Sequence, residues 1–228
     1  MLSNETLPPY PGDDAVLQQL QQAPEHLCCR VWEEPTSCIV LGRGGKLERE
    51  VTEETVLQDN VVVYRRSGGG GTVVLSPGML VVAIAAHVKD PYGSKRYFQL
   101  LQEPIIETLE ELGLPGVTQR GLSDLAYQGR KILGSSMRRQ RTLMLYQGVL
   151  LVDVDRDMFD RYLPHPPKEP DYREGRSHQS FTVTLRELGL EASLDVLQTR
   201  LQAHLHERLI ETLADDLTEP HPSLQKQS

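Results

Sequence analysis

Four consecutive glycines, residues 68–71, constrain the fold of this chain more than any other feature of its sequence. They lie between two apolar, β-branched segments, residues 61–63 and 73–75, so the sequence predicts a strand, a glycine turn and a second strand in succession. Glycines in a row lose much backbone entropy on folding and provide no side chain to pack. They are therefore typical of a flexible hairpin loop, or of a place where a ligand must approach the main chain closely.

Basic residues near the glycines favour the ligand interpretation. Arg65 and Arg66 directly precede the run, and a guanidinium group suits an anion or a planar polar ligand. A second glycine-bearing segment, residues 129–136, places Lys131 in an apolar sequence. An ammonium group in such surroundings needs a partner, which a ligand phosphate or carbonyl would supply. The alternative is an ordinary surface lysine whose stem lies along a sheet.

The size and charge of the chain limit its organisation and partners. With 228 residues, of which 39% are hydrophobic, the chain can bury a single substantial core. We expect one domain over residues 1–220, a disordered tail at residues 221–228 and no separate C-terminal accessory domain. The net charge of -8 argues against nucleic acid as the main partner, because nucleic-acid binding normally leaves a basic footprint.

The sequence also predicts a cytoplasmic location. No apolar stretch approaches the roughly 20 residues that a membrane span requires, and the polar, proline-rich start of the chain is not typical of a signal peptide. The three cysteines, Cys28, Cys29 and Cys38, form neither a C-x-x-C pair nor a metal-binding spacing. These features favour a reduced protein without membrane contact.

Hydrophobic periodicity predicts an α+β fold, a mixed β-sheet flanked by helices. Helices are expected from Asp13 or Asp14 to Gln22 and over residues 48–58, 97–112 and 193–217. Strands are expected over residues 28–32 and 38–41, on either side of a turn at 33–36, and over residues 79–86, 129–133 and 143–153. Residues 162–176 are rich in proline and charge, which is typical of a long ordered loop or lid.

Several familiar site chemistries match poorly. Residues 42–46, GRGGK, lack the spacing and the Ser or Thr of a nucleotide P-loop. The seven histidines form no H-E-x-x-H pair, and no G-x-S-x-G motif occurs. Hydrolase and zinc-enzyme functions are therefore disfavoured, and no resident metal site is predicted.

Motifs of one known family occur in order between Trp32 and Leu188. They are VW at residues 31–32 with IVLGR at 39–43, RRSGGGGTV at 65–73, SPGML at 76–80, SD at 123–124, GRKILGSS at 129–136 and QGVLLVD at 147–153. This set resembles the lipoate–protein ligase and octanoyltransferase superfamily, which is related in fold to biotin–protein ligases. The resemblance covers most of the chain.

The resemblance implies a site for an acyl-adenylate. Members of the family hold an acyl chain in an apolar tunnel, with its carboxyl end beside a catalytic lysine that corresponds to Lys131. The candidates for tunnel walls are Val73, Val74, Met79 and Ile132, which are equally expected as plain core residues. In a ligase the acyl group is joined to AMP, whose phosphate would need the charge of Lys131.

Further site residues follow from the same motifs. Arg66 would supply planar donors to the adenylate, the main chain of residues 69–71 would lie against it, and Asp124 would orient its amine or a magnesium ion. The implied cofactor-binding residues are Arg66, Gly69, Gly70, Gly71, Thr72, Val73, Asp124, Gly134 and Ser135. The implied cofactors are ATP and Mg²⁺, with lipoate or octanoate as the acyl substrate.

The cysteine positions favour a ligase over a transferase. Transferases of the superfamily pass the acyl group through a cysteine thioester. Here no cysteine follows Cys38, and the family's two nucleophile positions, in residues 121–128 and 163–167, lack one. The resemblance therefore implies that lipoate is activated to lipoyl-AMP and transferred to a lysine of a lipoyl-domain or glycine-cleavage-H-like carrier.

Three departures from the family pattern leave alternatives open. Leu75, Met79 and Gln147 stand where the family has histidine, asparagine and histidine. An ATP-independent octanoyl or lipoyl transferase and a non-catalytic acyl- or carrier-binding homologue therefore remain as alternatives. The chain also ends before the small C-terminal domain of many ligases, which implies a separate accessory subunit or a compact variant with its own carrier.

Overall fold

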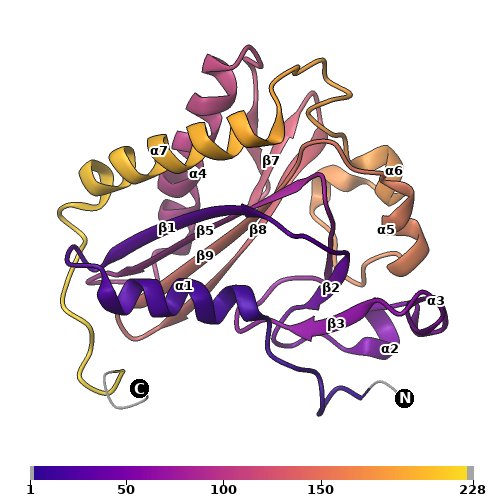
Figure 1. The fold of residues 1–228 in the computed structure, drawn as a ribbon, viewed down its shortest axis with the longest axis horizontal. Helices are drawn as coiled ribbons and strands as arrows, with labels where there is room; N and C mark the ends of the chain where they lie inside the picture. Colours follow the sequence, from indigo (N-terminus) through magenta and orange to yellow (C-terminus); the bar gives the residue numbers. More distant parts are fainter. Residues whose placement is uncertain (1–2, 225–228) are drawn as a thin grey trace.

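A six-stranded antiparallel sheet forms the centre of the fold in the computed structural model, which describes residues 3–224 (Figure 1). Its strand order is β1-β5-β9-β8-β7-β6, and every neighbouring pair is antiparallel. The strands are β1 (Leu27–Glu33), β5 (Met79–His87), β9 (Leu143–Leu151), β8 (Arg130–Gln140), β7 (Asp124–Tyr127) and β6 (Thr118–Arg120). The predicted α+β fold with helices flanking a sheet is confirmed.

A smaller, mixed sheet contains the strands on either side of the glycine run. It has the order β3-β2-β4, built from β3 (Val62–Arg65), β2 (Cys38–Leu41) and β4 (Val73–Leu75). β2 pairs in parallel with β3 and antiparallel with β4. The glycine run therefore crosses from one edge of this sheet to the other and is not a hairpin loop. The strands expected around the turn at 33–36 also form, but β1 and β2 belong to different sheets.

Three longer helices cover the two faces of the large sheet (Figure 1). α4 (Ser94–Glu111) and α7 (Leu194–Leu213) pack with Val82, Ile84 and Ala86 of β5, whereas α1 (Pro11–Gln22) packs with Ala83 and Ala85 of the same strand. Alternate residues of a strand point to opposite faces, so β5 is buried on both sides. Because both faces of β5 are buried, residues 79–86 are apolar without alternating with polar residues.

The remaining differences from the expected elements have local causes. The polar helix expected over residues 48–58 is two helices, α2 (Leu47–Glu50) and α3 (Glu53–Gln58), because Val51 is extended and packs into the core of the small sheet. β8 continues to Gln140, seven residues beyond its expected end. β6 and β7 were not expected, since their short sequences carry little apolar alternation.

The proline-rich segment is ordered, as expected, with little regular structure. We call residues 163–177 the strap; they connect α5 (Asp157–Tyr162) to α6 (His178–Phe181) and contain one 3₁₀ turn, η1 (Asp171–Arg173). In the predicted tail, residues 221–224 form a turn in which the Leu224 amide donates to the His221 carbonyl (2.8 Å), and residues 225–228 lie outside the described part. Within residues 3–224 no helix is long and apolar enough to cross a membrane.

The outer edge of β1 provides a test of how α7 is held. Gln202 of α7 accepts a hydrogen bond from the Val31 amide (2.8 Å) and donates one to the Cys29 carbonyl (3.1 Å). Gln202→Ala should lower the free energy of unfolding by about 1–3 kcal/mol, because it leaves these two main-chain groups without partners. Urea unfolding measures the change, and Thr199→Ala on the exposed face of α7 is the matched control. Equal midpoints for the two variants would contradict this account.

Candidate active site

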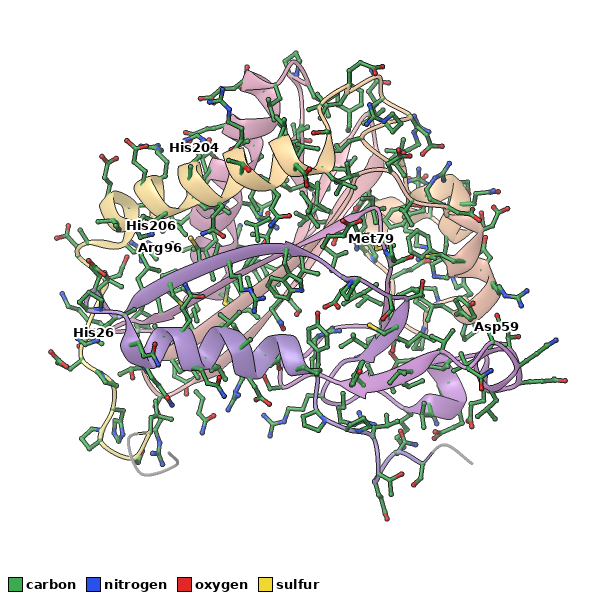
Figure 2. The ribbon with its side chains drawn as sticks, in the orientation of Figure 1. His26, Asp59, Met79, Arg96, His204 and His206 are labelled. Carbon is green, nitrogen blue, oxygen red and sulfur yellow. The ribbon has the colours of Figure 1, made fainter. Side chains whose placement is uncertain are left out.

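A cavity of about 830 Å³ lies between the small sheet, strands β8 and β9, and the strap. The structure brings nearly all of the predicted site residues to its wall, namely Arg66, Gly70, Gly71, Thr72, Val73, Asp124, Lys131, Gly134 and Ser135. Gly69 does not line it. Of the expected tunnel residues, Val73 and Val74 do, whereas Ile132 belongs to a buried core. Met79 is buried in the core of the small sheet (Figure 2).

Lys131 and Asp124 form an ion pair across strands β8 and β7. The Lys131 Nζ lies 2.8 Å from the Asp124 Oδ1, and the two side chains are 27% and 9% exposed. A half-buried ammonium group is therefore neutralised by a carboxylate on the adjacent strand. Lys131 is accordingly not the exposed surface lysine that the sequence left as an alternative.

A β-bulge places Lys131 on the cavity side. Residues 131 and 134 are three apart, so in a regular strand they would face opposite sides of the sheet. Ala126 pairs with Lys131 and Leu125 pairs with Leu133, which leaves Ile132 as an extra residue in β8. Gly134 then lies beneath the lysine, because a Cβ atom at residue 134 would be 2.5 Å from the Lys131 Nζ.

The turn that precedes Asp124 is fixed by buried polar groups. The Ser135 amide and hydroxyl both donate to the Ser123 carbonyl, at 3.0 and 2.6 Å. Gln102 of α4, which is fully buried, donates to the same carbonyl (3.0 Å) and to the Ser135 hydroxyl (3.2 Å). Ser135 therefore holds the turn that orients Asp124.

Tyr172 of the strap is a site residue that the motifs did not indicate. Its hydroxyl donates to the Asp124 Oδ2 at 2.9 Å, and burial, with the nearby Asp124 charge, raises the pKa of Tyr172 above its usual value. The phenol therefore remains a hydrogen-bond donor at neutral pH. The sequence signal was its position as the only tyrosine of the strap, residues 163–177, among prolines and charges.

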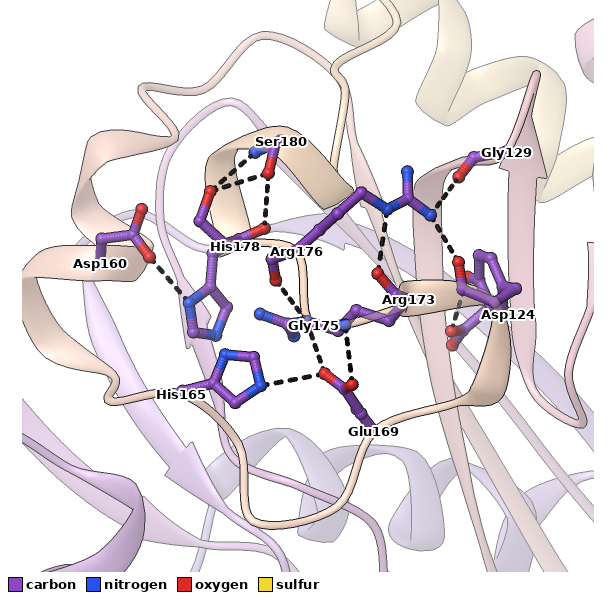
Figure 3. Close-up of polar contacts among 12 residues, drawn as sticks. Asp124, Gly129, Asp160, His165, Glu169, Arg173, Gly175, Arg176, His178 and Ser180 are labelled. Atoms are coloured by element: carbon purple, nitrogen blue, oxygen red, sulfur yellow. Dashed lines mark hydrogen bonds and ion pairs between the residues drawn. The ribbon is translucent and has the colours of Figure 1, made fainter.

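The strap is held in shape by its own charged side chains (Figure 3). Glu169 contacts the His165 Nε2 (3.0 Å) and the Arg173 Nε (3.3 Å) and accepts a hydrogen bond from the Gly175 amide (2.9 Å). At the end of the strap, Arg176 donates to the Gly129 carbonyl (3.1 Å), in the turn before β8. The strap is thus joined to the hairpin that carries Asp124 and Lys131.

His178, which directly follows the strap, also has a pKa that burial shifts. It lines the cavity from the start of α6 and contacts the Asp160 Oδ1 at 2.9 Å. Burial lowers the pKa of His178 although Asp160 opposes the shift. The imidazole is therefore neutral at pH 7.

Arg66 organises the glycine loop from within. It donates to the carbonyls of Gly69 (3.2 and 2.7 Å), Gly71 (2.7 Å) and Val40 (3.2 Å), and burial lowers its pKa to about 10, so it stays charged at neutral pH. Its neighbour Arg65 likewise donates to main-chain carbonyls of residues 42, 43 and 45. The two arginines therefore hold loops of the protein, rather than presenting free forks to a ligand.

The loop amides are the groups that remain for an anion. The carbonyls of Gly69 and Gly71 accept from Arg66, whereas the amides of Gly70 and Gly71 donate to no protein acceptor within residues 3–224. Gly42 packs against this loop so closely that a Cβ atom there would lie 2.0 Å from the Gly70 carbonyl oxygen. Thr72 is different, because its amide and hydroxyl both donate to Glu50 of α2 (3.2 and 2.8 Å).

Two of the three departures from the family pattern face the cavity. Leu75 and Gln147 line it, whereas Met79 is buried in the core of the small sheet. Gln147 donates to the Asp13 Oδ1 (2.8 Å), and the Asp13 Oδ2 accepts from the Ser67 amide (2.7 Å) and hydroxyl (2.5 Å). Asp13 thus joins the start of α1, the glycine loop and β9.

The described residues include no cluster of potential metal ligands and no exposed thiol. Within residues 3–224 no group of three or more His, Cys, Asp or Glu side chains could hold a metal ion. The three cysteines are buried and lie outside the cavity wall. Burial raises the pKa of Cys28 and Cys38 to about 12 and that of Cys29 to about 11, so none is a thiolate at neutral pH.

Solved structures with a similar fold include lipoate ligases. A bi-partite lipoate protein ligase of Thermoplasma acidophilum, described with its E2 lipoyl domain, gives a TM-score of 0.71 at 21% identity, over 91% of this chain and 79% of its own. A lipoate-protein ligase A bound with ATP gives 0.67 at 21% identity, over 91% and 81%. At these identities the comparison defines the fold, that of a lipoate-ligase catalytic domain.

The sequence identifies the family. The model of the lipoyl protein ligase A/B catalytic domain matches residues 12–206, and this chain belongs to that family. A lipoate–protein ligase of Streptococcus pyogenes serotype M5 (strain Manfredo) is 29% identical over 146 residues, 63% of this chain. The match spans 42% of the streptococcal protein's length.

Gly134→Ala should displace the Lys131 ammonium without unfolding the protein. The new Cβ would lie 2.5 Å from the Lys131 Cε and Nζ, the mobile end of a side chain, so the lysine must leave Asp124. We expect faster modification of Lys131 by an amine-reactive reagent, read by peptide mass spectrometry. Gly44→Ala, where a Cβ meets nothing within 4 Å, is the control. An unchanged modification rate would show that the lysine has room beside a methyl group.

Proposed function

We propose that this chain is an ATP-dependent lipoate–protein ligase, which activates lipoate or octanoate as an acyl-adenylate and transfers the acyl group to a carrier lysine. The observation that carries the proposal is the Lys131–Asp124 pair on the wall of a cavity that Gly70 and Gly71 also line, with amides that have no protein acceptor within the described residues. A fixed cation and main-chain donors around one cavity suit a substrate whose reacting groups are a carboxylate and a phosphate. The family membership and the ATP-bound relative support it.

The reaction would proceed in two steps. In the first, a carboxylate oxygen of the acyl substrate attacks the α-phosphorus of ATP, which forms a mixed anhydride with AMP and releases pyrophosphate. In the second, the carrier lysine amine attacks the acyl carbonyl carbon, an amide forms, the amine loses a proton and AMP leaves. The first step brings negatively charged oxygens together, and the second builds negative charge on the acyl oxygen and on the departing AMP. A positive charge beside these oxygens would therefore lower each barrier.

The chain's own residues would divide this work. The Lys131 ammonium would stabilise charge on the carboxyl and phosphate oxygens, with Asp124 holding its position. The glycine loop would donate its amides to the same ligand, in a shape that Arg66 maintains. Val73, Val74 and Leu75 supply apolar wall for the acyl chain.

In this proposal Mg²⁺ would bind together with ATP. Mg²⁺ is usually held by one or two carboxylates and by substrate phosphates. Both oxygens of Asp124 are engaged, one by Lys131 and the other by Tyr172. Asp124 therefore does not fit as a dedicated magnesium ligand in this arrangement, and the ion would be carried by the phosphates of Mg-ATP.

The partners would be carrier proteins that accept the acyl group on a lysine. The archaeal relative is described with its E2 lipoyl domain, which supports a lipoyl domain, or a glycine-cleavage-H-like protein, as the acceptor. That relative is also described as bi-partite, and the streptococcal match spans less than half of its protein. The bi-partite description supports, as part of the proposal, an accessory subunit on a separate polypeptide. The proposal also includes a cytoplasmic location, where the three thiols would stay reduced.

The direct test is lipoylation of an apo lipoyl domain, followed by intact-mass spectrometry. With lipoate and Mg-ATP the carrier should gain one lipoyl group, and omitting ATP should abolish the gain. Lys131→Ala should slow the reaction by about 10²–10³-fold, as expected for a lost charge stabiliser, whereas Lys95→Ala, at an exposed position on α4, should not. Transfer from an acylated carrier without ATP would instead establish a transferase. Carrier binding without turnover would indicate a non-catalytic homologue.

The thiols give a second test of ligase against transferase. Because burial keeps Cys28, Cys29 and Cys38 protonated, no acyl-thioester should form on this chain during turnover. Single Cys→Ala variants at the three positions should therefore keep the wild-type rate of carrier acylation. A hydroxylamine-sensitive mass gain on the protein, lost in one of the variants, would disprove the ATP-dependent route.

A further inference from the structure

Asp124 is bound by groups from two different parts of the chain. Its Oδ1 pairs with the Lys131 Nζ (2.8 Å), and its Oδ2 accepts the Tyr172 hydroxyl (2.9 Å). The Asp124 side chain is 9% exposed, so water has little access to replace either partner. The orientation of the carboxylate is therefore set by the lysine and the tyrosine together.

Tyr172 is itself fixed on both sides. Its ring lies 5.0 Å from the Phe181 ring, and the Arg120 guanidinium lies 5.5 Å above it. Arg176 donates to the Tyr172 carbonyl and also to the Gly129 carbonyl, so the strap is attached to the turn of the β7–β8 hairpin (Figure 3). The phenol hydroxyl thus has a defined place opposite Asp124.

We propose that Tyr172 is a positioning residue, which orients the Asp124 carboxylate so that its other oxygen holds the Lys131 ammonium against the substrate. The terminal torsion of an aspartate is broad and roughly two-fold, and one partner alone leaves the carboxylate free to rotate. A second hydrogen bond from the strap removes this freedom. The consequence for catalysis rests on the proposed function, whereas the attachment of the strap to Asp124 does not.

The chain contains a matched arrangement outside the cavity. The Tyr162 hydroxyl donates to the Asp59 Oδ2 (2.8 Å), and that carboxylate is also bound by Arg161 (2.7 Å). Asp59 caps the end of α3 (Figure 2), and neither Tyr162 nor Asp59 lines the cavity. Tyr162→Phe therefore removes the same kind of hydrogen bond without touching the site.

The test is a double-mutant cycle of Tyr172→Phe and Asp124→Ala on the rate of lipoyl-adenylate formation. Tyr172→Phe should lower kcat by about 10–100-fold, the range that one hydrogen bond to a charged group spans. If Tyr172 acts through Asp124, it should have little further effect in the Asp124→Ala background. Tyr162→Phe should change kcat equally little in both backgrounds. Independent, multiplicative effects of Tyr172→Phe and Asp124→Ala would overturn the proposal.

Hydrogen exchange of the strap amides supplies a readout that needs no turnover. Tyr172→Phe and Asp124→Ala should each speed exchange over residues 163–177 in the unliganded protein. The double variant should exchange no faster than the faster of the two single variants. Unchanged exchange in both single variants would refute the attachment. A wild-type protein that acylates no carrier would refute the proposed function, while this exchange cycle would still decide the role of Tyr172.

Discussion

A cation on the wall of an apolar cavity must have a fixed counter-charge, and much of this structure provides one for Lys131. The pair with Asp124 depends on the bulge at Ile132, which turns the lysine to the cavity side, and on the absence of a side chain at Gly134. Ser135 fixes the turn before Asp124. The local sequence of β8 is thus determined by the ion pair as much as by the sheet.

In the glycine loop the arginine donors bind carbonyls of the protein's own main chain. Arg66 is buried, and its N–H groups donate to carbonyls of the loop, so its side chain fixes the shape of the loop. With the Gly69 and Gly71 carbonyls bonded to Arg66, the amides of Gly70 and Gly71 have no protein acceptor within residues 3–224. Main-chain amides held in this way need no rearrangement when a ligand arrives, which is the advantage of a preorganised site.

The sequence predicts the parts of this protein whose signals are local. The buried strand β5 and the helices α4 and α7 follow from apolar periodicity, and Lys131 and Asp124 follow from ordered motifs. The pairing of strands could not be predicted in this way, because the partners of β1 and β2 depend on contacts between residues distant in sequence. Tyr172 was missed for the same reason, since it reaches Asp124 from 48 residues away. The short strands β6 and β7 carry too little apolar pattern to be seen.

The two halves of the site lie on different sheets, so their relative position needs its own explanation. The amides belong to the loop of the small sheet, whereas Lys131 belongs to the large one. Asp13, which is 4% exposed, joins them by accepting from Ser67 at the start of the loop and from Gln147 of β9. A buried carboxylate needs donors, and the amide of Gln147 supplies one whatever the pH. Glutamine in place of the family's histidine therefore gives this chain a permanent link between the loop and the strand, and the departure is consistent with an intact site.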